Sequence, residues 1–257
     1  MAEKKIWITG ASRGIGAEVA RQLARAGWTV AVSARSDDEL AELVGEANAL
    51  NGEIHAYPLD ITDAEACVRV FADIEGAHGP LDTVLLNAGT HEPIDGTAFS
   101  VEPVRKLVEI NLMGTVHCLA PVIERFVART SGKIAVVSSV AGYRGLPTSS
   151  GYGATKAGLI NMCEALRPEL EMAGVTICCV TPGFVRTPLT DKNPFPMPFL
   201  MEVEDAAARI VRGLERDAFE ITFPRRFTYM LKVLRMLPYA LYFALTRRIV
   251  PKDGETS

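Results

Sequence analysis

Hydrophobic residues along this chain form short apolar runs that alternate with longer segments of helical pattern. Seven runs have the length and composition of buried strands, at residues 4–9, 29–34, 54–59, 83–87, 133–138, 175–180 and 220–223. Such alternation is typical of βαβ units. It predicts an α/β fold, a single doubly wound parallel sheet of about seven strands with helices on both faces. Ligands of such sheets bind beyond the carboxyl ends of the strands.

The first apolar run leads directly into the sequence TGASRGIG at residues 9–16, and residues 17–26 then have the composition of a helix. Gly10 permits a tight turn and Gly14 lets the backbone approach a pyrophosphate. Gly16 allows the helix to pack closely on the strand. A strand, a glycine-rich turn and a helix N-terminus together predict a cradle for phosphate groups.

Tyr152 and Lys156 lie four residues apart in the segment GYGATKAG, and Ser139 precedes Tyr152 by thirteen residues. Four residues make about one helical turn, so the phenol and the ammonium share one helix face. By itself such a pair usually marks a solvated surface. Downstream of a phosphate cradle, it indicates a site for proton transfer to one substrate atom.

Together these features resemble the short-chain dehydrogenase/reductase family, in the Rossmann-like arrangement that the strand pattern predicts. The resemblance extends to about residue 224 and rests on seven motifs in the family's order: TGASRGIG (9–16), LDIT (59–62), NAG (87–89), NLMG (111–114), SSVAG (138–142), YGATK (152–156) and PGFVRT (182–187). It implies an oxidoreductase that interconverts a carbonyl and an alcohol. The same fold also supports a different hypothesis, a non-catalytic nucleotide sensor.

The resemblance assigns catalytic roles to four residues. Tyr152 would donate the proton, and Lys156 would bind the nicotinamide ribose. A nearby ammonium also favours the tyrosinate, so Lys156 is expected to lower the tyrosine pKa from about 10. Ser139, which the spacing favours over Ser138, would stabilise the developing alkoxide. Asn111 would hold a water behind the lysine in a proton relay.

The same resemblance implies a set of residues that contact a dinucleotide. Asp60 would meet the adenine amino group, Asn87 would order the adjacent loop, and Thr187 would hold the carboxamide. The complete expected set is Gly10, Ser12, Arg13, Gly14, Ile15, Gly16, Arg35, Asp60, Asn87, Ala88, Gly89, Tyr152, Lys156, Pro182, Gly183, Val185 and Thr187.

The preference between NAD and NADP depends on the residues at the end of the second strand, where an acidic residue would bind the ribose 2′-hydroxyl of NAD. Ala34 occupies that position and Arg35 follows it. Arg35 and Arg13 offer charge-assisted bonds to a 2′-phosphate, which predicts NADP(H). Two alternatives remain: both arginines are ordinary surface residues, or Asp37 and Asp38, slightly later in the chain, serve the ribose.

The C-terminal residues depart from the family pattern. Residues 1–224 carry twenty basic and twenty-nine acidic residues, whereas residues 225–252 carry seven basic and none acidic. Phe227, Met230, Leu231 and Leu234 recur at helical spacing with Lys232 and Arg235 opposite, and Pro238 should interrupt a second apolar helix. The uncharged run 236–246 is shorter than the roughly 20 residues that cross a bilayer. Docking on the protein itself or a partner subunit, a lid over the substrate, and contact with an anionic membrane all remain open.

Composition limits the remaining possibilities. No linker or repeat divides the 257 residues, so we expect a catalytic domain over residues 1–224 with residues 225–257 as its helical extension. Five cysteines without C-x-x-C pairing and the absence of an apolar leader favour a cytoplasmic protein, and the basic tail leaves a peripheral place at a membrane surface open. Scattered histidines predict no metal, and the charge of −4 predicts no nucleic-acid partner.

The apolar loop 188–201 suggests a lipid-like ketone as the substrate. The resemblance implies a homodimer, with a tetramer less secure.

Overall fold

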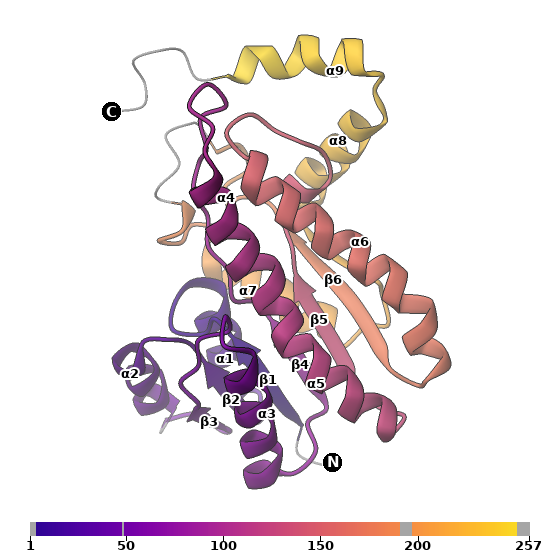
Figure 1. Ribbon diagram of the computed structural model, residues 1–257. Helices are drawn as coiled ribbons and strands as arrows, with labels where there is room; N and C mark the ends of the chain where they lie inside the picture. Colours follow the sequence, from indigo (N-terminus) through magenta and orange to yellow (C-terminus); the bar gives the residue numbers. More distant parts are fainter. Residues whose placement is uncertain (1–3, 48, 191–196, 251–257) are drawn as a thin grey trace.

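The computed structural model describes residues 4–47, 49–190 and 197–250 (Figure 1). Its sheet has the strand order β3-β2-β1-β4-β5-β6-β7, and all neighbouring strands are parallel. The strands are β1 (Lys5–Thr9), β2 (Thr29–Ser33), β3 (Glu53–Ala56), β4 (Thr83–Leu86), β5 (Lys133–Val137), β6 (Thr176–Pro182) and β7 (Glu220–Phe223). The order reverses direction at β1, as in a doubly wound sheet. The predicted fold class is therefore confirmed.

Strand boundaries differ from the prediction by a few residues. β3 ends at Ala56 and not at residue 59, although the amides of Tyr57 and Leu59 still donate to β2 and the residue after it. Pro58 stands between them, where an N–H would point away from β2 to the open edge of the sheet, so proline is tolerated there. β6 continues to Pro182, two residues beyond the expected end, because β7 pairs along its whole length.

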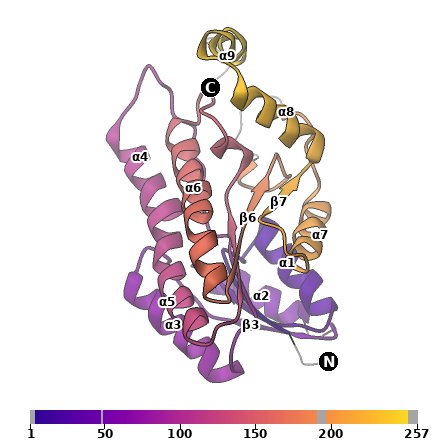
Figure 2. The same cartoon turned by 90° about the vertical axis from the view of Figure 1, so that its right-hand side faces the viewer.

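Two layers of helices cover the sheet, as Figure 2 shows edge-on. Packing partners place α1 (Gly14–Arg25), α2 (Asp37–Ala47) and α7 (Val203–Leu214) on one face, and α3 (Ala64–His78), α5 (Gly114–Ala128) and α6 (Ser150–Met172) on the other. β1 illustrates why both faces close: Ile6 and Ile8 pack with α1 and α7, and Trp7 packs with α3 and α5. Alternate side chains of a strand point to opposite faces, and here both are apolar.

A continuous helical segment crosses the second face. α4 (Val101–Leu107) passes through a π-helical turn, η1 (Val108–Met113), into α5. Among the described residues, 101–128 is the single helix long and apolar enough to cross a membrane by length and composition. In the fold it packs against α3, α6 and β4, as a core helix does.

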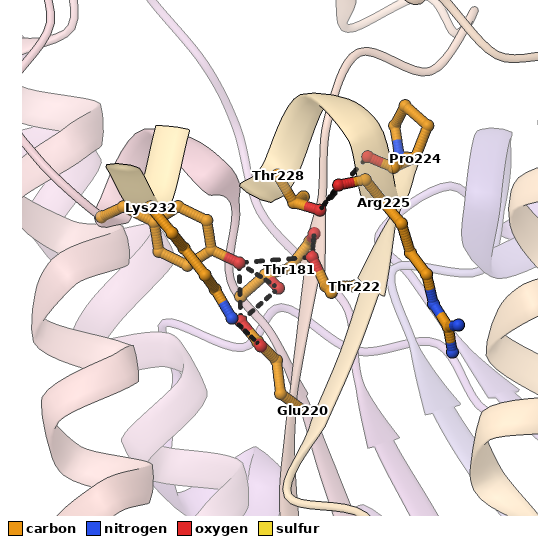
Figure 3. Close-up of polar contacts among 8 residues, drawn as sticks. Thr181, Glu220, Thr222, Pro224, Arg225, Thr228 and Lys232 are labelled. Atoms are coloured by element: carbon orange, nitrogen blue, oxygen red, sulfur yellow. Dashed lines mark hydrogen bonds and ion pairs between the residues drawn. The ribbon is translucent and has the colours of Figure 1, made fainter. Parts of the chain in front are cut away.

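Two further helices follow β7. α8 (Arg225–Met236) packs on the end of the sheet through Phe227, Thr228 and Leu231, and Pro238 precedes α9 (Tyr239–Thr246), as the sequence predicts. The expected apolar face is wrong at Met230, which is 52% exposed. The reason is that Lys232 takes a place against the sheet, where its ammonium bonds the Glu220 carboxylate of β7 (Figure 3).

Candidate active site

Two adjoining cavities, of about 440 and 110 Å³, lie at the carboxyl ends of the strands. They share part of their walls, including Asn87, Gly89 and Thr187. The predicted residues that line the larger cavity are Gly10, Ser12, Arg13, Gly14, Ile15, Arg35, Asp60, Asn87, Ala88, Gly89 and Thr187. Those that line the smaller one include Ser139, Tyr152, Lys156, Pro182, Gly183 and Val185. Gly16 and Asn111 line neither cavity.

The glycine-rich turn shapes the wall of the larger cavity. Gly10 has φ of +66°, and a Cβ there would lie 2.5 Å from the Ala88 Cα, so the turn needs glycine. A Cβ on Gly16 would lie 2.5 Å from the Gly10 carbonyl oxygen, so Gly16 acts by packing behind the turn. α1 begins at Gly14, three residues earlier than the sequence suggested, and Arg13 at its N-cap provides no side-chain cap. Its first N–H groups are therefore left for an anion.

Asn87 holds this turn in place. Its amide group donates to the carbonyl oxygens of Thr9 and Gly10 at 3.1 and 2.9 Å. Its backbone N–H donates to the Thr9 hydroxyl at 3.1 Å. The end of β4 is thereby bonded to the end of β1, and this gives a structural reason for asparagine at this position.

Two arginines line the wall of the larger cavity. Arg13 and Arg35 both line the wall there, whereas Asp37 and Asp38 are exposed in the first turn of α2 and do not. Acidic residues at that place complement the helix dipole. Partial burial opposes ionisation of Asp60, but hydrogen bonds from Thr62 and the charge of Arg35 bring its pKa below the ordinary value.

Tyr152 and Lys156 meet the smaller cavity from the same face of α6, with the Lys156 Nζ 5.7 Å from the centre of the tyrosine ring. Lys156 is 3% exposed, and its ammonium donates to the Val137 carbonyl oxygen at 2.9 Å. Burial lowers the pKa of Lys156 to about 8.

The expected lowering of the Tyr152 pKa is not what the structure shows. Desolvation of the phenol raises its pKa, and a hydrogen bond with Ser139 only partly offsets this. The Lys156 ammonium donates to the Val137 carbonyl oxygen, and its charge does not lower the Tyr152 pKa in this arrangement. In this arrangement the tyrosine is a protonated acid at neutral pH.

The two adjacent serines have different tasks. The Ser138 hydroxyl is buried and donates to the Lys156 carbonyl oxygen at 2.7 Å, which fixes α6 against the end of β5. The Ser139 hydroxyl accepts from the Ala141 N–H at 3.1 Å and also bonds Tyr152. The sequence preference for Ser139 as the catalytic serine agrees with this placement, and its role in the reaction stays a prediction.

Asn111 lies fully buried in the π-helical turn η1. Its side chain exchanges two hydrogen bonds with the backbone of Thr90, at 2.7 and 2.9 Å. Its backbone carbonyl oxygen accepts from the Thr115 hydroxyl. A Cβ on Gly89 would lie 3.1 Å from the Asn111 Oδ1 and 3.5 Å from the Lys156 Nζ. Asn111 and Lys156 therefore both approach Gly89, and the bonds of Asn111 position the loop after β4, while the relay water stays a prediction.

Sequence reasoning missed several residues of the site. His91 stacks edge-on against Tyr152, with ring centres 4.7 Å apart, and its only signal was its place two residues after NAG. Glu39 lines the larger cavity beside Arg35, since the first turn of α2 brings it back toward β2. Leu189 and Thr190 were not missed, because they belong to the expected substrate loop 188–201 and line the smaller cavity; residues 191–196 of that loop lie outside the described residues. Among the described residues, no group of histidine, cysteine and acidic side chains could hold a metal.

The family model described as short chain dehydrogenase matches residues 4–195. The chain belongs to the short-chain dehydrogenase family. The matched segment contains β1 to β6 and every predicted site residue, and it ends before α8 and α9. Proteins of similar sequence are named oxidoreductases and reductases.

Individual relatives agree with this membership. An uncharacterized oxidoreductase of Myxococcus xanthus is 36% identical over 249 residues, covering 97% of this chain and 98% of that protein. The ketoacyl reductase HetN of a Nostoc species is 31% identical, covering 85% of this chain and 77% of the relative. The structure of ElxO with NADP bound is 25% identical with a TM-score of 0.78, covering 86% of this chain and 98% of ElxO.

Proposed function

We propose that this short-chain dehydrogenase is an NADPH-dependent reductase that converts an apolar or lipid-like ketone into an alcohol. One observation carries the proposal: Ser139, Tyr152 and Lys156 converge on a cavity that adjoins a larger, arginine-bearing cavity built on the glycine-rich turn. The larger cavity fits a dinucleotide, because a helix N-terminus without a side-chain cap faces the expected pyrophosphate.

The cofactor, when bound, supplies the hydride. Arg13 and Arg35 would hold the 2′-phosphate through charge-assisted bonds, and the absence of a carboxylate at Ala34 removes the usual partner of an unphosphorylated ribose. ElxO, whose structure contains NADP, supports the same preference by similarity.

Proton delivery falls to Tyr152. Its pKa is raised above the ordinary value, so the phenol is protonated near neutral pH and can donate to a carbonyl oxygen. The Ser139 hydroxyl would bond the same oxygen as negative charge develops. Lys156, with a pKa of about 8, would restore the proton from the Asn111 side of the site.

An apolar substrate is supported by the surroundings of the smaller cavity. Val137, Val185 and Leu189 contribute to its wall. Phe184, which lies between the cavity residues Gly183 and Val185, packs against Phe227 of α8 with ring centres 5.6 Å apart, and Phe199 packs against the same ring at 5.8 Å. Relatives named ketoacyl reductase, such as HetN, act by name on acyl ketones.

A turnover assay with purified full-length protein tests this proposal. NADPH oxidation should rise with chain length across a series of ketones, and NADPH should be used with higher kcat/KM than NADH. Equal use of NADH would overturn the cofactor choice, and faster turnover of small polar ketones would overturn the substrate class. Tight NADPH binding without turnover of any carbonyl would favour the sensor hypothesis.

Assembly and location are part of the same proposal. We infer a homodimer through the continuous helix η1–α5 and through α6, where Met113 of η1 and Val127 of α5 are exposed apolar residues. We place the enzyme in the cytoplasm, where NADPH is a common reductant. Sedimentation of the protein, and of a variant with Met113→Glu and Val127→Glu, tests the interface; an unchanged mass would contradict it.

A further inference from the structure

The helix α8 has an apolar stripe on its solvent side. Phe227 and Leu231 face the sheet and are buried, whereas Tyr229, Met230, Val233 and Met236 are between 52% and 81% exposed. These four recur at spacings of one, three and three residues, so they lie along one helix face. A helix at the surface of a globular protein normally presents polar residues there.

The helix α9 continues this surface. Of its eight residues only Tyr242 and Thr246 are buried, and Tyr239, Leu241, Phe243 and Leu245 are between 44% and 71% exposed. A helix that is apolar all round is ordinarily found in a core or a membrane. Ile249 and Val250 extend the exposed apolar residues beyond α9.

Specific contacts hold both helices in place. The Arg144 guanidinium donates to the carbonyl oxygens of Leu234, Arg235 and Leu237, which satisfies the C-terminal end of α8. The same group lies 3.8 Å from the Tyr242 ring centre, and the Tyr242 hydroxyl donates to the Gly145 carbonyl oxygen. The exposed apolar side chains are thus presented by an ordered element.

Glu220 adds a second attachment. It accepts from Lys232 of α8 and from the hydroxyls of Tyr143 and Thr181, and the Thr228 hydroxyl bonds the carbonyl oxygens of Pro224 and Arg225 at the start of the helix (Figure 3). Lys232 is therefore used inside the fold. The basic residues left at the surface are Arg225, Arg226, Arg235, Arg247 and Arg248.

Charge and length identify what covers this surface. Residues 225–250 contain no acidic residue, and none of these five arginines forms an ion pair within the described part of the chain. An isologous contact with a second copy would set one arginine group against the other. The uncharged run 236–246 would measure about 16 Å as a helix, half of the roughly 30 Å hydrocarbon core, so it does not span. An apolar helix face with arginines at its borders matches an interfacial element on anionic lipid.

We propose that α8 and α9 bind this protein peripherally to anionic lipid bilayers, with the exposed apolar residues in the interfacial region and the arginines at the headgroups. Figure 1 shows both helices beyond the sheet end to which the strands lead, the end that holds the cavities. Phe227 of α8 also packs against Phe184, which follows β6. If the proposed lipid-like substrate is correct, the same contact brings the cavity close to its source.

Vesicle flotation with the full-length protein tests the membrane contact without any catalytic readout. The probe is phosphatidylcholine vesicles with about 30% phosphatidylglycerol, compared with pure phosphatidylcholine, each at 0.1 and 0.5 M salt. We expect binding to the anionic vesicles that weakens at high salt. Arg247→Glu with Arg248→Glu should weaken it at least about tenfold, and Leu241→Ser with Phe243→Ser should abolish it.

Matched controls make the same kinds of substitution at exposed positions outside α8 and α9. Arg209→Glu, on the exposed side of α7, and Met172→Ser, 91% exposed at the end of α6, should bind vesicles as the parent protein does. Equal binding of the parent, the Arg247→Glu/Arg248→Glu variant and the Leu241→Ser/Phe243→Ser variant would overturn the proposal. So would absence of vesicle binding together with a smaller particle mass for Leu241→Ser/Phe243→Ser, since this assigns the surface to a second copy.

Activity on a water-soluble carbonyl, measured without vesicles, separates the two proposals. Both variants should keep parental turnover, because the four substituted side chains are exposed and line neither cavity. Vesicle binding without turnover would remove the reductase proposal alone. Turnover without vesicle binding would remove the membrane contact alone.

Discussion

The dinucleotide cradle and the α8–α9 extension lie at the same end of the sheet, but they are built in opposite ways. In the cradle, Gly10, Gly16 and Asn87 pack so closely that a single added carbon meets backbone atoms. In the extension, a few contacts hold α8 and α9 to the sheet end while most large side chains are exposed. The comparison shows that close packing holds the backbone of the cofactor site in one position. The extension is attached at a few points and leaves an apolar face for another partner.

The largest effect is expected at the centre of the site. Tyr152→Phe removes only the hydroxyl, so kcat should fall by about 10³ to 10⁴ while NADPH affinity changes little. Steady-state kinetics and NADPH fluorescence titration measure the two quantities. A variant with more than a tenth of the parental kcat would show that the proton comes from elsewhere.

Two phenylalanines of the extension give the next test. Phe227 is 5% exposed and Phe243 is 49% exposed. Phe227→Ala should lower the free energy of unfolding by about 3–5 kcal/mol, whereas Phe243→Ala should stay within about 0.5 kcal/mol. Urea denaturation measures both. Equal losses would mean that α9 is packed as tightly as α8.

Two glycines test how closely the cradle is packed. Gly10→Ala adds a Cβ at φ +66° that would sit 2.5 Å from the Ala88 Cα, so we expect at least about 2 kcal/mol of destabilisation and loss of NADPH binding. Gly45→Ala in α2 meets no atom within 4 Å and should stabilise by about 0.5–1 kcal/mol. Thermal unfolding and fluorescence titration separate the two outcomes.

Cofactor discrimination should change by a smaller factor. Arg35→Ala removes one charge-assisted contact with the 2′-phosphate, which should lower the NADPH-to-NADH ratio of kcat/KM by about 10- to 100-fold. Arg209→Ala on α7 serves as the control. An unchanged ratio for Arg35→Ala would assign the discrimination to Arg13 or to another group.

The smallest effect concerns pH. Burial opposes ionisation of Glu220, but bonds from Lys232 and Tyr143 hold its pKa below the ordinary value. A lowered native pKa contributes stability above the unfolded pKa of about 4.3 and loses it as the pH falls further. Glu220→Gln should therefore cost about 1–2 kcal/mol at pH 7 and less near pH 3. Denaturation at both pH values measures this, and a pH-independent loss would contradict it.

Seven strands and the glycine turn follow from local pattern, because strand periodicity and motif spacing are properties of neighbouring residues, and the family resemblance implied most of the residues around both cavities. The same reasoning failed where a distant residue decides. Lys232 was placed on the outer face of its helix, since Glu220 becomes its partner only after β7 and α8 fold together. His91 and Glu39 were missed because nothing near them in the chain marks a cavity.

The sequence by itself determined the family, the sheet, and the Tyr152–Lys156 pair, since a helix fixes the relation of residues four apart. Only the tertiary structure decided how that pair works. It directs the Lys156 ammonium to the Val137 carbonyl and buries the phenol, which reverses the expected direction of the Tyr152 pKa shift. It also decided which apolar residues of the C-terminal helices are covered, because burial depends on elements that meet across the fold.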